Sequence, residues 1–392
     1  MSTGTKIEWT DATWNPIVGC SHASPGCDHC YAERMAQRLS NMGKAPYTDI
    51  GDDAPLYGVV HDWKWTGKTV LHEPALSQPL HRRKPQRIFV CSMADLFHAS
   101  VPFEWIDQVM AVILACGSLE NRTHTFQVLT KRAKRMQEYF TARTPVELLK
   151  AWAKAGNGIV TMANEDVLFS EYVEQFCWAK WDSSEHGYPV AAGPGADWSH
   201  PENLFPLKNL WLGVTAEDQQ RADERIPLLL QTPAAVRFVS IEPMLGPVLL
   251  KYDRGDWCFD YFAGNKWVED CDATEADKWG KLNWVICGGE TGHVARPMHP
   301  NWARSLRDQC QTANVPFFFK GWGDWAPLED HLDGDSQKDK CPVCLVKPDG
   351  RVISPYCQED APGAQMCRVG KKAAGRCLDE MEWDEFPAGG AL

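Results

Sequence analysis

Three cysteines stand close together near the start of the chain, in the stretch GCSHASPGCDHCYAERMA at residues 19–36. Cys20, Cys27 and Cys30 have the spacing C-x6-C-x2-C and lead directly into a helical pattern. Three thiolates on one loop can form disulfides, ligate zinc or hold an iron–sulfur cluster. These chemistries place different demands on the rest of the chain, so the surrounding sequence discriminates between them.

Disulfide bonding is the weakest of the three interpretations. The first residues, MSTGTKIEWTDATW, are polar, and no apolar run reaches the roughly 20 residues that a membrane-spanning helix requires. We therefore expect a cytoplasmic protein without a membrane partner, in a compartment that keeps thiols reduced. Its fifteen cysteines are then expected to be thiols or metal ligands.

Zinc and an iron–sulfur cluster differ in the number of ligands. Structural zinc takes four, often from two separated C-x2-C pairs. Cys341 and Cys344, in the stretch CPVC, form a second pair, so zinc at these two residues stays open, with Cys357 as a third candidate ligand. A zinc site shared with the first loop would bridge the two ends of the chain and leave one thiol over. A cubane cluster held by three cysteines instead keeps one iron free for a substrate or cofactor. We predict a [4Fe-4S] cluster on the three cysteines of the first loop.

The elements that would position this loop alternate between strand and helix. Seven short apolar runs predict buried strands, at residues 13–20, 87–97, 125–132, 210–218, 236–246, 283–292 and 315–323. Helical patterns between them predict a parallel α/β architecture with right-handed crossovers. We expect a partial or complete parallel (β/α) barrel over residues 1–325, with the cluster loop at 19–31. Insertions at about 141–206 and 251–282 are expected to cover its mouth, and 326–392 to form a C-terminal extension or lid.

Polar residues follow these apolar runs at nearly every predicted strand end. They are Ser92, Asp95, Lys131, Thr215, Glu217, Glu242, Glu290 and Lys320. In (β/α) barrels the active site forms at the carboxyl ends of the strands. A purely structural explanation is that polar residues occur wherever a strand leaves the core. It accounts for any one of these residues, but less well for acids and lysines after nearly every strand. We expect Glu242 and Glu290 to be buried carboxylates able to move a proton, with Lys320 adding a cation.

These motifs resemble two groups of known proteins. The wide cysteine loop, with EWTDATWNP before it and SIEPMLGP, CGGETG and FFFKGWG later, is similar to a phage and bacterial three-cysteine-motif family. The likeness covers most of residues 5–325 and the stretch MCRVGKKAAGRCLDEMEWDEFP at 366–387. A three-cysteine loop after the first strand of a parallel barrel also resembles the radical S-adenosylmethionine (SAM) enzymes, which usually space the cysteines C-x3-C-x2-C.

The second resemblance implies an enzyme of radical SAM fold. Its [4Fe-4S] cluster would bind S-adenosyl-L-methionine at the free iron, and one electron, from a donor of the flavodoxin or ferredoxin type, would cleave it. The resulting 5′-deoxyadenosyl radical would remove hydrogen from a substrate. With this cofactor we assign cofactor binding to His29, Ser92, Asp95, Lys131, Thr215, Glu217, Gly288 and Gly289, and catalysis to Glu242, Glu290 and Lys320. On their chemistry, Lys131 could pair with the SAM carboxylate or with a substrate phosphate, and the two glutamates could instead be SAM and substrate ligands.

Two features depart from the radical SAM pattern. His29 stands before the last cysteine, where those enzymes often have an aromatic residue near the adenine. The glycine-glycine-glutamate motif that usually follows their second strand is replaced here by CSMADLF, so Ser92 and Asp95 are assigned to the polar end of SAM. The triplet GGE occurs instead at 288–290, where it would contact a nucleotide or the substrate.

The substrate is less constrained than the cofactor. With 40 basic against 52 acidic residues the net charge is −12, which disfavours nucleic acid and keeps a small molecule or a partner protein open. Two basic segments, HRRKPQR at 81–87 and LTKRAKR at 129–135, are expected to flank strand ends at the mouth. Together with the phage association they favour a nucleic-acid base or a nucleotide, in modification or repair. The alternative is a non-catalytic binding protein stabilised by zinc or a cluster, distinguished by a closed set of four ligands.

Overall fold

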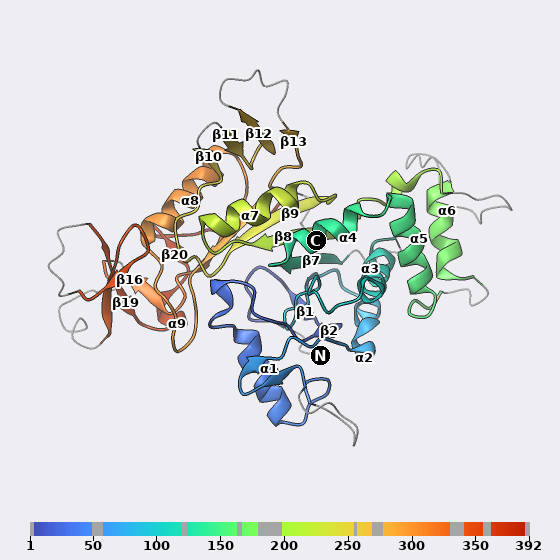
Figure 1. Cartoon of the computed structure of the whole chain (residues 1–392), viewed down its shortest axis with the longest axis horizontal. Helices are drawn as coiled ribbons and strands as arrows, with labels where there is room; N and C mark the ends of the chain where they lie inside the picture. Colours follow the sequence, from blue (N-terminus) through green and yellow to red (C-terminus); the bar gives the residue numbers. More distant parts are fainter. Residues whose placement is uncertain are drawn as a thin grey trace.

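The centre of the protein is a seven-stranded sheet. The computed structural model describes residues 4–48, 58–118, 124–162, 167–178, 198–254, 257–268, 277–329, 341–355 and 362–388. The strand order is β1-β6-β7-β8-β9-β14-β15, and every neighbouring pair runs parallel. The sheet curls into half a barrel, so the predicted α/β class and partial parallel barrel are confirmed (Figure 1).

The strands of this sheet and the helices have the following bounds. The strands are β1 (Ala12–Trp14), β6 (Arg87–Val90), β7 (Thr125–Thr130), β8 (Leu210–Thr215), β9 (Val236–Ile241), β14 (Trp284–Gly288) and β15 (Phe317–Gly321). The helices are α1 (Tyr31–Asn41), α2 (Glu73–Leu76), α3 (Phe103–Ser118), α4 (Ala133–Thr141), α5 (Pro145–Gly156), α6 (Phe169–Trp178), α7 (Gln219–Leu230), α8 (Pro300–Thr312) and α9 (Lys371–Ala374). Among the described residues, no helix is long and apolar enough to cross a membrane.

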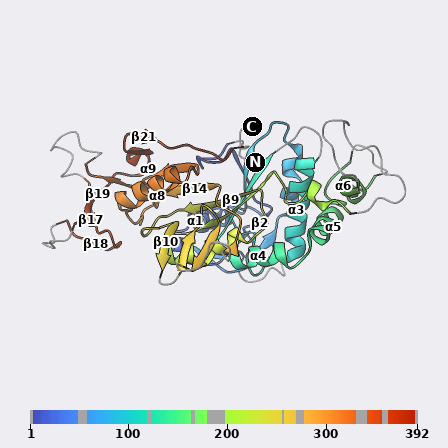
Figure 2. The same cartoon turned by 90° about the horizontal axis from the view of Figure 1, so that it is seen from above.

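Smaller sheets surround the central one. The pairs are β2 (Ile17–Val18) with β5 (Val70–Leu71), β3 (Val60–His61) with β4 (Lys64–Trp65), and β20 (Cys377–Leu378) with β21 (Met381–Glu382). One four-stranded sheet contains β10 (Lys251–Arg254), β11 (Trp257–Asp260), β12 (Asn265–Val268) and β13 (Asp277–Lys278). A second contains β16 (Trp325–Pro327), β17 (Val343–Val346), β18 (Val352–Ile353) and β19 (Ala364–Arg368). Figure 2 shows β17–β19 at one end of the molecule, α6 at the other, and β9 and β14 between them.

Aromatic side chains fill the concave face of the curled sheet. We call this set the concave cluster; its buried members are Trp9, Phe89, Trp211, Phe238, Trp284, Ile286 and Phe318. Trp9 lies before the first strand, yet its ring centroid is 4.8 Å from that of Phe89 and 6.3 Å from that of Trp284. The segment ahead of β1 therefore occupies the inside of the curve.

The two-residue repeat of a strand places charges directly above the concave cluster. Side chains of one face recur at every second position. Lys320 thus follows Phe318 on β15, and Glu242 continues the face of Phe238 just beyond the end of β9. The concave face consequently changes from aromatic to charged at the carboxyl ends of the strands.

The described parts of the two insertions pack on outer helices. Residues 163–166, 179–197, 255–256 and 269–276 lie outside the described residues, so the expectation that the insertions cover the barrel mouth stays a prediction. In the first, α5 packs against α3 and α6 and buries Trp152 and Phe169 in the core outside the sheet. The second forms the sheet β10–β13 beside α7, where Tyr252 hydrogen-bonds Asp223 and the Gly280 amide donates to the Leu230 carbonyl at 2.8 Å. Both insertions carry apolar surface, which these outer helices bury.

The predicted C-terminal extension returns to the central sheet. Asp384 pairs with Phe318 in an antiparallel bridge, so the segment runs along the edge strand β15. The Trp284 indole donates to the Glu385 carbonyl at 2.8 Å. The Phe386 ring lies 5.1 Å from that of Trp284, and the Arg87 guanidinium is 4.2 Å from the Phe386 ring centroid. This segment therefore covers an exposed edge and completes the concave cluster.

Candidate functional site

The predicted polar residues meet the three cysteines at one edge of the sheet. Gly19 forms a parallel bridge with Ala94, which places the loop of residues 20–30, here called the cysteine loop, beyond the carboxyl end of β6. The residues predicted from the strand ends lie after or at the ends of their strands, along this same edge: Ser92, Asp95, Lys131, Thr215, Glu217, Glu242, Gly288, Gly289, Glu290 and Lys320. The predicted residues therefore lie along one edge of the sheet, as their places after the strands implied.

The three thiols are unbridged and influence one another electrostatically. Burial raises the pKa of Cys20 and of Cys30, Cys30 adds to the rise at Cys20, and Cys27 adds to the rise at Cys30. Within the described ranges, no three His, Cys, Asp or Glu side chains converge as ligands of a single ion would. In a cubane each thiolate binds its own iron, so convergence on one point is not required. Three neighbouring thiols fit such a cluster in donor chemistry.

Cys20 is held in contact with a buried ion pair. Burial, and then the Asp95 charge, raise the pKa of Cys20 to about 12, and the Arg132 guanidinium opposes them from 3.8 Å. Arg132 also donates to the Ser21 carbonyl at 2.9 Å and to Asp95 at 2.9 Å. Asp95 accepts the Lys131 amide at 3.1 Å with its second oxygen and the Thr130 hydroxyl at 2.7 Å with its first. Asp95 therefore positions Arg132, which positions the start of the cysteine loop.

We predict slow and strongly pH-dependent alkylation of Cys20 in the folded chain. A raised pKa leaves little thiolate at neutral pH, and the thiolate is the reactive form. Iodoacetamide at pH 7 should modify the exposed Cys377 first, and the rate at Cys20 should rise about tenfold per pH unit up to pH 9. Peptide mass spectrometry measures both rates. Equal rates at pH 7 in the folded chain would contradict the prediction, and denaturation in urea should equalise them.

Glu217 fixes the middle of the cysteine loop from the side of β8. Its fully buried carboxylate accepts the Ser24 hydroxyl, the Gly26 amide at 3.2 Å and the Arg225 guanidinium at 2.9 Å. Burial raises the pKa of Glu217, but Lys131 and Arg225 outweigh burial and hold it below its ordinary value. A Cβ on Gly26 would lie 2.6 Å from this carboxylate, so only glycine fits there. Both oxygens of Glu217 are thus occupied by the protein.

Glu290 fixes the other side of the loop. Its carboxylate accepts the Arg296 guanidinium at 2.7 and 2.9 Å, and it lies 3.0 Å from His29 Nδ1. Arg296 reaches further, to the Pro25 carbonyl at 2.8 Å and to Asp28 at 3.1 Å. Burial raises the pKa of Glu290, but the bonds from Arg296 and His29 bring it below its ordinary value. Glu217 and Glu290 therefore hold the loop as ionised carboxylates from two directions.

The remaining predicted residues fall into two groups. Lys131 and the Glu242–Lys320 ion pair carry charge at the mouth: Lys131 Nζ is 4.0 Å from Glu217, and its charge lowers the pKa of Cys30. Ser92 and Thr215 instead make hydrogen bonds within the protein that hold the backbone around the site. The Ser92 hydroxyl bonds Asn15 at 3.1 Å and its carbonyl accepts the Tyr31 hydroxyl, while the buried Thr215 offers its carbonyl to an arginine of α7.

The sequence analysis missed the residues that hold the loop. These are Ser21, Ser24, Gly26, Arg132, Arg225 and Arg296. Only Arg132 carried a signal, as part of the basic segment 129–135. The others pair with partners far away in the sequence, and a single sequence does not reveal such pairs.

Only one of the two basic segments lies at the mouth. Residues 129–135 follow β7 and include Lys131 and Arg132 of the site. Residues 81–87 instead lead into the amino end of β6, where Arg87 contacts Asp11 at 3.1 Å. The expectation that 81–87 flanks the mouth was wrong, because this segment precedes its strand and parallel strands expose their carboxyl ends at the opposite edge.

The second pair of cysteines does not form the expected metal pair. Cys341 is bonded to Cys367 in a disulfide, and Cys344 is a buried thiol on β17. A sulfur in a disulfide is not a thiolate ligand, so the prediction of zinc at Cys341 and Cys344 is corrected. The disulfide also corrects the expectation that Cys341 and Cys367 carry thiols: β17 and β19 are paired neighbours, which brings the two sulfurs together. Cys357 lies outside the described residues.

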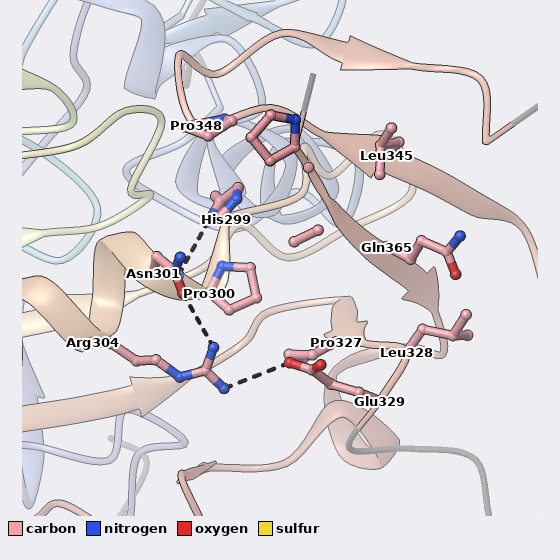
Figure 3. Close-up of a pocket in the computed structure, with 13 residues that line it drawn as sticks. His299, Pro300, Asn301, Arg304, Pro327, Leu328, Glu329, Leu345, Pro348 and Gln365 are labelled. Atoms are coloured by element: carbon pink, nitrogen blue, oxygen red, sulfur yellow. Dashed lines mark hydrogen bonds and ion pairs between the residues drawn. The ribbon is translucent and has the colours of Figure 1, made fainter. Parts of the chain in front are cut away.

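A large cavity lies elsewhere, between α8 and the C-terminal sheet. It has a volume of about 770 Å³ (Figure 3). Arg304 in its wall reaches Asn301 at 3.3 Å and Glu329 at 3.8 Å, and His299 accepts the Asn301 amide at 3.1 Å (Figure 3). The described residues that line it include none of the predicted site residues. The site at the strand ends is therefore distinct from this cavity.

Comparison with known proteins yields one match. A family model described as a protein of unknown function (DUF5131) matches residues 4–387. No curated protein and no solved structure matches the chain.

Proposed function

Because the chain belongs to the DUF5131 family, which has no assigned function, we propose its function from the site itself: a radical SAM enzyme. In this proposal Cys20, Cys27 and Cys30 bind a [4Fe-4S] cluster whose free iron takes S-adenosyl-L-methionine. The substrate is a nucleic-acid base or a nucleotide. The observation that carries the proposal is a loop of three unbridged thiols, fixed by buried ion pairs at the carboxyl edge of a parallel half-barrel.

The electrostatics around the loop support an anionic cluster. Three thiolates and the nearby Asp95 carboxylate would repel one another in a partly buried site without counter-ions. Here Arg132 lies 3.8 Å from the Cys20 sulfur, and Lys131 acts electrostatically on Cys30. Burial raises the pKa of Cys30 overall, and the amides of Ala32 and Glu33, at the start of α1, oppose this rise, as expected at a helix N-terminus. These groups favour thiolates over thiols once metal binds.

Each part of the chain then has a defined task. When bound by Cys20, Cys27 and Cys30, the cluster with SAM would supply the radical chemistry that removes hydrogen from a substrate. The carboxylates of Glu217 and Glu290 keep the loop from shifting. The Glu242–Lys320 pair lies at the mouth, each side chain about one-fifth exposed, where one carboxylate and one ammonium can bind substrate or exchange a proton. The aromatic concave cluster fills the inside of the curled sheet next to this mouth and excludes water from it.

The test is anaerobic reconstitution. The chain is loaded with iron and sulfide, reduced, and examined by EPR with and without SAM, and 5′-deoxyadenosine is assayed. We expect a cluster signal that changes on adding SAM, and 5′-deoxyadenosine production. Changing any one of Cys20, Cys27 and Cys30 to Ala should abolish both signals, because no other thiol is available on the loop.

A matched control is Cys377→Ala, which removes an exposed thiol outside the loop and should leave both signals intact. Tight zinc binding by four ligands with no cluster uptake would refute the enzyme and favour a metal-stabilised binding protein. Cluster uptake without any effect of SAM would refute the SAM part alone.

A further inference from the structure

A smaller hollow of about 400 Å³ opens beside the cysteine loop at the strand ends. We call it the basic hollow. Its lining includes five cationic side chains, Lys6, Lys320, Lys371, Lys372 and Arg376, and two carboxylates, Glu8 and Glu242. The balance of five positive and two negative charges is opposite in sign to the net charge of −12 of the whole chain. Local positive charge in an acidic protein indicates a site for an anion.

Some of these charges are available to a ligand. Three of the five cations are ion-paired: Lys320 with Glu242, Lys371 with Glu8 at 2.7 Å, and Arg376 with Asp384. Among the described residues, Lys6 and Lys372 have no ion-pair partner, and both are exposed. The second oxygen of Glu8 is buried without a hydrogen-bond partner in the part of the chain that the structure describes. The hollow thus offers ammonium groups to an anion.

Glycines make the floor of the hollow rigid. The turn after β14 and the turn after β15 lie in direct backbone contact: the Gly289 amide donates to the Gly321 carbonyl at 2.9 Å, and the Asp324 amide to the Glu290 carbonyl at 2.9 Å. A Cβ on Gly289 would overlap the Trp322 carbonyl, so no larger residue fits there. A ligand therefore binds a preformed surface, and little conformational entropy is lost on this side of the hollow.

The same turn joins the hollow to the cysteine loop. Gly289 and Thr291 line the hollow, whereas Glu290 between them binds His29, the residue before Cys30. A molecule anchored in the hollow is consequently separated from the cysteine loop by a single turn of backbone.

We propose that the basic hollow binds a phosphate group of the substrate, with Lys6, Lys371 and Lys372 as its principal contacts. The phosphate belongs either to a free nucleotide or to a nucleic-acid strand, two sources of one chemistry. This inference rests on the proposed function in one respect: the rest of the substrate is taken to extend from the hollow toward the cysteine loop. Phosphate binding itself requires no cluster.

The test measures binding by the full chain, before and after cluster reconstitution. The probes are thymidine 5′-monophosphate, thymidine, and a fluorescent single-stranded oligothymidylate. The parent should bind the monophosphate about tenfold or more tighter than thymidine, or bind the strand with strong salt dependence. A Lys371→Ala/Lys372→Ala variant should lose most of the phosphate preference. For the strand it should reduce the slope of log affinity against log salt by about 1.4, because each contact contributes about 0.7.

The matched control is Arg83→Ala/Lys84→Ala, which removes two exposed charges at the opposite edge of the sheet. It should keep the parent's affinities, and Lys372→Ala alone, which leaves Glu8 paired with Lys371, should show a smaller loss. Binding of thymidine equal to that of its monophosphate, with no strand binding, would overturn the inference. An equal loss in both double variants would also overturn it. Because the cluster-free chain is measured too, failure here is independent of the SAM and EPR results.

Discussion

Glu217→Ala is expected to lower the free energy of unfolding by about 3–5 kcal/mol, because breaking a buried ion pair leaves its partner charged and unpaired. The Glu217 side chain is 0% exposed and that of Arg225 is 7% exposed, so solvent screens neither group. The substitution also removes the acceptor of the Ser24 hydroxyl and the Gly26 amide. We therefore expect the cysteine loop to lose its central anchor and the variant to retain less iron.

The pH dependence of this effect has a definite sign. The pKa of Glu217 is lowered in the folded chain, so its contribution is present above the ordinary carboxyl pKa and is lost as the pH falls through the folded value. The difference between parent and variant should accordingly shrink in acid. Denaturant titration at several pH values measures it.

The control is Glu224→Ala on α7, the helix that carries Arg225. Glu224 pairs with Arg221 at 3.7 Å but is 52% exposed, so its loss should cost about 1 kcal/mol or less. Equal effects of the two substitutions would contradict the role that we assign to Glu217.

Arg132→Met is expected to reduce the iron retained after reconstitution by about tenfold or more. The substitution removes the cation beside Cys20 and leaves the buried Asp95 carboxylate without its guanidinium partner. Because Arg132 lowers the pKa of Cys20, its loss raises that pKa further and disfavours the thiolate that a metal requires. The contact from Arg132 to the Ser21 carbonyl is lost as well.

Two further variants separate charge from geometry at this position. Arg132→Lys keeps the charge but not the planar group that bonds Asp95 and Ser21 together, so we expect an intermediate loss. Arg135→Met removes an arginine that stacks on Phe103 at 4.5 Å and donates to the Val101 carbonyl, away from the loop, and should retain the parent's iron. Iron and sulfide per chain after gel filtration give the result. Parental iron content in Arg132→Met would contradict the prediction.

The sheet and the edge that carries the site could be predicted because both depend on local pattern. Apolar runs such as those of β8 and β9 are buried on both faces, and a parallel order places all their carboxyl ends together. The positions of Lys131, Glu242 and Lys320 at the mouth followed from that rule alone.

The partners within the site could not be predicted in the same way. Glu217 meets Ser24, and Glu290 meets His29, across 193 and 261 positions of sequence. The residues next to a glutamate that follows a strand do not indicate whether its carboxylate binds a ligand or another loop of the protein. The packing of the described parts of the two insertions could not be predicted for a similar reason: their apolar surface was visible in the sequence, but the outer helices that bury it were not identifiable as partners.

The closure of the concave cluster has a consequence for how the protein is made. Trp9 lies before the first strand and Phe386 after the last, and both pack on Trp284. On the ribosome, the aromatic interior of the half-barrel therefore stays incomplete until the segment around Phe386 has emerged. A nascent chain that already contains all seven strands still exposes an aromatic surface, the kind that chaperones bind and that drives aggregation in unfinished proteins.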